Sequence, residues 1–185
     1  MRGIFQRRKW IKIFTIYDTG NTGALRASDF ERFAETLAKI RDWQPGSTEH
    51  HQLLNQFMDR WAHIQGTIQD HVAAAPINEI SLENWVDYHR FMLDKSDQYP
   101  TEINAFAQII FNVCDVDDSG NLDLDEWVTL FRAFGLPVVY AQEAFSSLDK
   151  NRDGSLQKEE VIAALNDFYY SDDPSTLANF MFGPY

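Results

Sequence analysis

Two twelve-residue segments place oxygen-bearing side chains at regular intervals. Residues 115–126 (DVDDSGNLDLDE) carry them at positions one, three, five, nine and twelve, and residues 149–160 (DKNRDGSLQKEE) repeat this spacing. Calcium takes six to eight oxygen ligands at about 2.3–2.6 Å in a flexible geometry. A short loop that winds around one such ion must therefore offer an oxygen at nearly every second residue. The two segments predict two calcium sites.

Each segment supplies a complete candidate ligand set. In the first, the expected ligands are the side chains of Asp115, Asp117 and Ser119, the backbone carbonyl of Asn121, Asp123 through a water, and both carboxylate oxygens of Glu126. In the second, they are Asp149, Asn151, Asp153, the carbonyl of Ser155, Gln157 through a water, and Glu160. Glycine stands at the sixth position of both, where the chain must turn sharply. Leu122 and Leu156 at the eighth position are expected to join the loops through a short strand contact.

A third segment, residues 18–29 (DTGNTGALRASD), follows the same pattern with fewer ligands. Its candidates are Asp18, Thr22, the carbonyl of Ala24, and Asp29. Gly20 offers no side-chain oxygen at the third position, and Arg26 places a cation at the ninth. Fewer negative ligands weaken calcium binding, and a short closing acid favours magnesium. Two alternatives remain open: a third, weaker ion site, or a structural loop that keeps its shape without metal.

The apolar residues around these segments predict a helix on each side. Phe111 and Cys114 precede the first segment, and apolar residues follow it at spacings of three and four: Trp127, Leu130 and Phe131. Such spacings mark the buried face of a helix. A long helix is expected from about Thr48 to Asp70. Thr101 is a candidate cap for the helix that enters residues 115–126.

Residues 73–84 (AAAPINEISLEN) are the best partner for residues 18–29. Ile80 takes the eighth position, and Ser81–Trp85 resembles Asp123–Trp127. The ligand positions hold Ala73, Ala75 and Ile77, and Asn84 replaces the closing acid. No divalent ion can be held there by side chains, so this segment is expected to be a silent partner.

Composition and charge exclude several classes of protein. The chain has 185 residues and a net charge of −12, which argues against nucleic-acid binding. We see no signal peptide, no apolar run of about twenty residues, and one cysteine, so we expect a cytoplasmic protein without stable membrane insertion. Arg7, Arg8 and Lys9 are expected on a solvated helix face. No nucleophile or phosphate-loop motif supports an enzyme, and a monomer is the simplest expectation.

The complete pattern resembles the EF-hand proteins. Four hands with a degenerate second one, and a closing segment Asn179–Pro184, are similar to the sarcoplasmic calcium-binding proteins with their calerythrin-like and calexcitin-like relatives. This resemblance implies an all-α fold of four helix–loop–helix motifs in two packed pairs, a compact globule with short β contacts between paired loops. The pairs would divide the chain at 1–98 and 99–185. The C-terminal segment would lie against the apolar interior.

The same resemblance implies a calcium buffer. A sensor opens a groove that is commonly rich in methionine, and this chain has four methionines against 14 phenylalanines. Two alternatives remain: a sensor that changes shape and binds a partner, and a carrier of a small hydrophobic, luciferin-type ligand. Calcium is the expected cofactor, at two sites with a third possible, and magnesium is an expected competitor. A protein partner cannot be named from the sequence.

Overall fold

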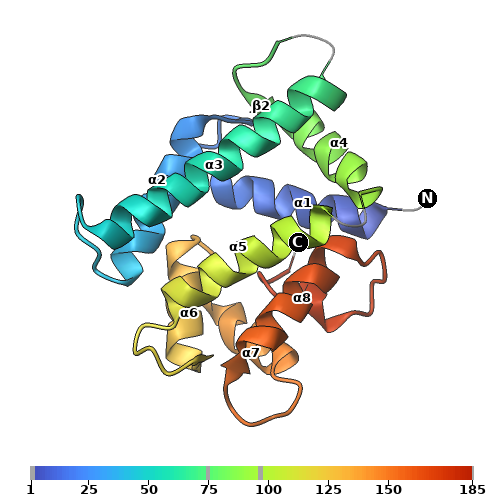
Figure 1. Ribbon diagram of the computed structural model, residues 1–185. Helices are drawn as coiled ribbons and strands as arrows, with labels where there is room; N and C mark the ends of the chain where they lie inside the picture. Colours follow the sequence, from blue (N-terminus) through green and yellow to red (C-terminus); the bar gives the residue numbers. More distant parts are fainter. Residues whose placement is uncertain (1–2, 74–75, 96–97, 185) are drawn as a thin grey trace. The chain divides into compact units, whose positions relative to one another are not determined.

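The computed structural model describes residues 3–73, 76–95 and 98–184, and these residues form an all-α fold (Figure 1). The first four helices are α1 (Ile4–Tyr17), α2 (Ala27–Ile40), α3 (Thr48–His71) and α4 (Leu82–Leu93). The next four are α5 (Gln98–Cys114), α6 (Leu124–Ala133), α7 (Ala141–Leu148) and α8 (Lys158–Tyr170). Two 3-10 helices are η1 (Val138–Tyr140) and η2 (Leu177–Phe180). The all-α prediction and the long helix at 48–70 are confirmed.

Four two-residue strands join the loops in pairs. Strand β1 (Ala24–Leu25) pairs antiparallel with β2 (Ile80–Ser81), and β3 (Asn121–Leu122) pairs with β4 (Leu156–Gln157). The register places Leu25 opposite Ile80 and Leu122 opposite Leu156. The eighth-position contacts are therefore confirmed, including the alignment of the silent segment 73–84 with residues 18–29. Ala74 and Ala75 lie outside the described residues.

The chain forms two compact units. The N-terminal unit runs from Trp10 to α4, whereas the C-terminal unit combines residues up to Lys9 with α5 and everything after it. The first turns of α1 therefore belong to the C-terminal unit. The prediction from the sequence placed all of residues 1–98 in the N-terminal pair. In the N-terminal unit α2 lies along α3, and in the C-terminal unit α5 lies along α8 (Figure 1).

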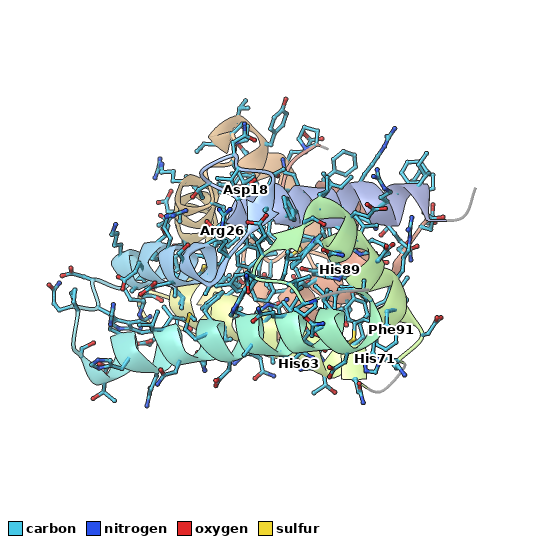
Figure 2. All side chains as sticks on the ribbon, turned by 90° about the horizontal axis from the view of Figure 1, so that it is seen from above. Asp18, Arg26, His63, His71, His89 and Phe91 are labelled. Carbon is cyan, nitrogen blue, oxygen red and sulfur yellow. The ribbon has the colours of Figure 1, made fainter. Side chains whose placement is uncertain are left out.

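Aromatic rings build the core of the N-terminal unit. The imidazole of His89 is stacked on Trp10 at 5.4 Å between ring centroids and meets Trp85 edge-on at 4.6 Å. Trp85 Nε1 donates a hydrogen bond to the carbonyl of Trp10 at 2.8 Å. Burial, with the positive charge of Arg60 adding to it, lowers the pKa of His89 well below its ordinary value. His89 (Figure 2) is therefore a neutral core ring at physiological pH.

The core of the C-terminal unit includes the end of the chain. Phe182 packs against Phe134 and Phe168, with centroids 6.1 and 5.2 Å apart. Met181 is buried beside it. Cys114, at the end of α5, is also buried, and this burial, with the charge of Glu126 adding to it, raises the pKa of its thiol. The packed tail agrees with the arrangement that the family resemblance implies.

The start of α5 differs from the sequence-based expectation. The helix begins at Gln98, so Thr101 lies within its first turns and is not the cap. Pro100 stands in the first turn, where a helix tolerates proline because the missing N–H would have no intrahelical partner. None of the helices in the described ranges combines the length and the apolar character that a bilayer crossing needs.

Lys9 is not on a solvated face, contrary to expectation. Its side chain is fully buried, and its Nζ donates to the carbonyl of Ser171 at 2.6 Å. The carboxylate of Asp172 accepts hydrogen bonds from the backbone N–H groups of Gly3 and Phe5, which fixes the start of α1 against the end of α8. The solvent-facing part of the basic cluster is reduced to Arg7 and Arg8, which are exposed.

Burial of the ammonium group makes stability depend on pH. Burial lowers the pKa of Lys9 to about 8, against the attraction of Asp167, Asp172 and Asp173. Between pH 8 and the unfolded-state pKa near 10.4, the unfolded chain binds more protons than the folded chain, so the contribution of Lys9 to the free energy of unfolding rises with pH.

We expect the wild type to gain stability relative to Lys9→Met between pH 8 and 10. Denaturant unfolding at both pH values measures this difference. The matched control is Arg8→Met, which removes an exposed charge of the same helix and should shift stability equally at both pH values. If the free energy of unfolding of the wild type falls with rising pH relative to that of Lys9→Met, the lowered pKa of Lys9 is contradicted.

Candidate metal centres

The loop at 115–126 (loop III) gathers three carboxylates. Asp115 Oδ1 accepts from the backbone N–H of Ser119 at 2.9 Å, and its Oδ2 accepts from Gly120 at 3.1 Å. Asp115, Asp117 and Glu126 each offer an oxygen, and these atoms lie within 4.8 Å of one another. Clustered carboxylate oxygens are the type of ligand that calcium takes in proteins.

Both carboxylate oxygens of Glu126 accept hydrogen bonds from the backbone of loop III. Its Oε1 accepts from the N–H of Val116 at 2.7 Å, and its Oε2 accepts from the N–H of Asp123 at 3.0 Å. Asp123 in turn accepts from the N–H of Glu126 at 2.8 Å, which makes a capping box that starts α6. One glutamate therefore links the start of the loop to the helix that leaves it.

The loop at 149–160 (loop IV) repeats this closure. Glu160 Oε1 accepts from the N–H of Lys150 at 3.0 Å, and its Oε2 accepts from the N–H of Gln157 at 3.2 Å. Asp149 accepts from the N–H of Asp153 at 3.2 Å and from that of Gly154 at 3.0 Å. The two loops thus hold their first and last acids in the same way.

Loop IV is the less negative of the two. Asn151 and Gln157 stand where loop III has aspartates, and both side-chain amides donate to Asp153 Oδ2, at 3.0 and 2.8 Å. Hydrogen bonds from the backbone and hydroxyl of Ser155 hold the pKa of Asp153 below its ordinary value. Asp153 is therefore ionised at neutral pH and available as a ligand.

The backbone at the turn explains the two glycines. Gly120 and Gly154 have φ values of +83° and +85°, in the left-handed region that a side chain disfavours. Their N–H groups point at the first aspartate of their own loop. The glycine lets the chain reverse at the sixth position, as the sequence predicts for the turn between the candidate ligands.

The loop at 18–29 (loop I) has the same turn as loops III and IV, but its closing acid, Asp29, has a different hydrogen-bond partner. Asp18 accepts from the N–H groups of Thr22 and Gly23, both at 2.8 Å, as the first aspartates of the other loops do. Asp29 Oδ2 accepts from the N–H of Arg26 at 2.8 Å. Its Oδ1, however, accepts from the guanidinium of Arg32 at 3.0 Å. In loops III and IV the corresponding oxygen binds the backbone of the second loop residue.

The positive charge of Arg26, at the ninth position, acts on loop I. Burial works to raise the pKa of Asp18, but hydrogen bonds from Thr22 and Gly23 and the charge of Arg26 outweigh it, so the pKa lies below the ordinary value. Asp18 and Arg26 lie close together in Figure 2. Arg26 also pairs with Glu79 of the silent loop, at 2.5 Å. The ninth-position arginine is therefore a contact between the paired loops.

The silent loop at 73–84 (loop II) has neutral side chains, Ser81 and Asn84, at its ninth and twelfth positions. The hydroxyl of Ser81 accepts from the N–H of Asn84 at 3.2 Å and caps α4, and it donates to Asn84 Oδ1 at 3.0 Å. Ser81 thus does for α4 what Asp123 does for α6, as the sequence alignment of the two segments predicts.

Sequence reasoning missed Arg32 as a participant in loop I. It follows Asp29 by three residues, a spacing at which opposite charges meet on a helix surface. That signal is visible in the sequence but common on exposed helices, so its role at a loop is evident only from the contacts. The ligand assignments themselves remain predictions.

A family model described as "EF hand" matches residues 106–131 and 141–165, which contain loops III and IV with their flanking helices. Each of these two segments is therefore an EF hand. Calerythrin of Saccharopolyspora erythraea is 24% identical over 165 residues, 86% of this chain and 89% of that protein. This similarity confirms the resemblance to the calerythrin-like group.

Two further similarities extend over most of the chain. The luciferin-binding protein of Renilla reniformis is 24% identical over 169 residues, 90% of this chain and 86% of that protein. The solved structure of a calcium-binding protein from Streptomyces coelicolor superposes with a TM-score of 0.72 at 22% identity, covering 89% of this chain and 98% of that one. The structural likeness confirms the fold of the chain.

Proposed function

We propose that this EF-hand protein binds two calcium ions, one in loop III and one in loop IV, and acts as a calcium buffer. The observation that carries the proposal is the matched closure by Glu126 and Glu160, each of which ties both ends of its loop. In each loop this glutamate can offer two oxygens to an ion that the earlier acids also face. Such a set suits calcium, which accepts bidentate carboxylates.

Magnesium is the expected competitor. It requires near-octahedral geometry at about 2.0–2.1 Å and keeps several of its waters, so a closing glutamate that offers two oxygens suits it less well than calcium. Loop IV, with three carboxylates among its ligand candidates against four in loop III, should bind a divalent cation less tightly than loop III.

The apolar side chains support a buffer more than a sensor. Met92 and Met181 are buried, and the large rings of the C-terminal hands, such as Trp127 and Phe131, have no exposed surface. Buffers open little on binding, whereas sensors expose a methionine-rich groove. A sensor, and a carrier like the related protein named for binding luciferin, are the alternatives that the test below distinguishes.

The proposed role is non-enzymatic, with calcium as the partner and without nucleic-acid binding. We place it in the cytoplasm, because Cys114 is the single cysteine and is buried as a free thiol. A monomer remains the simplest expectation, and calcium binding in cis does not require a second copy.

Calorimetric titration of the calcium-free protein with calcium, in the presence and absence of magnesium, tests this proposal. We expect two calcium ions per chain and a weaker apparent affinity with magnesium present. An apolar fluorescent dye should respond little to calcium. A steep rise in dye binding would favour a sensor, and a co-purifying chromophore would favour a carrier. The absence of calcium binding would refute both the buffer and the sensor.

A further inference from the structure

We propose that loop I is a metal-independent hand in which the guanidinium of Arg32 makes the link between the second and twelfth residues that the closing glutamate makes in loops III and IV. This proposal completes the site count of the proposed function, although its own test does not require loops III and IV to bind calcium. It is carried by the contacts of Asp29 and Arg32, and by the charges that surround them.

The closing residue of loop I makes different contacts from those of loops III and IV. Glutamate at the twelfth position of loops III and IV reaches back to the N–H of the second loop residue, at 2.7 and 3.0 Å. Asp29 is one methylene shorter, and in loop I a different group makes the link. Arg32 Nη1 donates to Asp29 Oδ1 at 3.0 Å and to the hydroxyl of Thr19 at 2.9 Å. Arg32 therefore connects the second and twelfth residues of the loop.

The carboxylates of loop I have arginines as neighbours. The ligand positions of loop I hold two carboxylates, Asp18 and Asp29, and two arginines face them: Arg32 binds Asp29, and the charge of Arg26 acts on Asp18. Arg26 also pairs with Glu79, so a divalent ion entering this loop would meet two carboxylates of which one, Asp29, is already bound by an arginine. In loops III and IV it would meet an excess of carboxylates, which favours its entry.

Asp29 is buried, and its partner Arg32 is half exposed. The side chain of Asp29 is 7% exposed, whereas that of Arg32 is 51% exposed. An ionised carboxylate with little access to water requires a charged or hydrogen-bonding partner. Arg32 supplies one through a charge-assisted hydrogen bond. Calcium would have to displace this partner and then rely on a closing acid that is too short to hold it in the usual way.

The first test measures, without any added metal, whether the contacts of Arg32 with Asp29 and Thr19 stabilise loop I. In the chelated protein, Arg32→Gln should accelerate amide hydrogen exchange at Arg26, whose N–H binds Asp29, and at Thr22 and Gly23 in the same loop. Exchange at Gly120 of loop III should not change. The matched control is Arg90→Gln, because Arg90 forms an i,i+3 pair with Asp87 at 2.8 Å on α4, away from any loop. Equal exchange in Arg32→Gln and wild type would overturn the proposal.

The second test asks whether Arg32 opposes an ion. Calcium titrations use a protein whose other loops are disabled by Glu126→Gln and Glu160→Gln. With loop I unchanged, we expect no calcium heat. Gly20→Asp with Asp29→Glu restores two ligands, and a side chain at Gly20 would meet Thr22 at an ordinary 3.4 Å. Adding Arg32→Gln to that pair should strengthen calcium binding by about tenfold or more, since a charged hydrogen bond contributes about 1.5–3 kcal/mol.

Two outcomes contradict the proposal in this second test. One is a calcium site in the disabled protein with native loop I that Asp18→Ala abolishes. The other is an affinity of the repaired loop that Arg32→Gln leaves unchanged or weakens. Failure of the two-site buffer proposal would look different: the wild type would bind no calcium, while the exchange result for Arg32→Gln would still hold.

Discussion

Glu126→Gln should remove the calcium site of loop III, and Glu160→Gln should remove that of loop IV. Each substitution takes away the negative charge and one of the two strong acceptor oxygens at the residue that closes the loop. The glutamine can still cap the following helix, because its carbonyl can accept the backbone N–H. We therefore expect each variant to fold and to bind one calcium ion, and the double variant to bind none in a calorimetric titration.

The controls for these variants stand one position earlier in each loop. Asp125→Asn and Glu159→Gln remove the same charge from exposed side chains outside the ligand set. Both should retain two calcium ions, with affinities lowered only by the weaker long-range attraction. If a control loses a site, or if the double variant still binds two ions tightly, the ligand assignment is wrong.

Calcium should stabilise the protein by mass action. Each site that is filled at about 100 times its Kd contributes about 2.7 kcal/mol, so two sites contribute about 5 kcal/mol, provided that the unfolded chain does not bind. The carboxylates gathered in loop III repel one another, and a bound cation removes this cost. For a chain of this size the gain corresponds to a rise in Tm on the order of 10–20 °C.

Thermal unfolding with chelator and with excess calcium measures this effect. The double variant Glu126→Gln with Glu160→Gln should unfold at the same temperature in both conditions. A calcium-dependent rise that survives in the double variant would place the stabilising ion elsewhere in the chain. A wild type that is indifferent to calcium would contradict binding at both loops.

Much of the architecture was predictable because it repeats. The ligand spacing fixes where helices begin and end around Asp115 and Asp149, and the eighth-position residues predict both strand pairs. The pairing of Leu25 with Ile80 shows that even the silent hand could be aligned from its strand and cap. These features are local, so twelve residues of sequence contain most of the information.

The features that sequence reasoning missed depend on contacts between distant segments or on a choice among common local signals. Lys9 appeared solvated because its neighbours are basic, but its partner, Ser171, lies at the other end of the chain. Thr101 is a good cap by type, yet α5 starts earlier, at a helix turn that contains a proline. Arg32 has a local signal, the i,i+3 spacing, that most surface helices also carry.

The most direct measurement is a crystal structure of the protein grown with excess calcium, with anomalous scattering to locate the ions. We predict one ion in loop III and one in loop IV, each about 2.3–2.6 Å from six to eight oxygens. Glu126 and Glu160 should both be among the ligands. Well-ordered loops that contain no ion at saturating calcium would contradict the central claim.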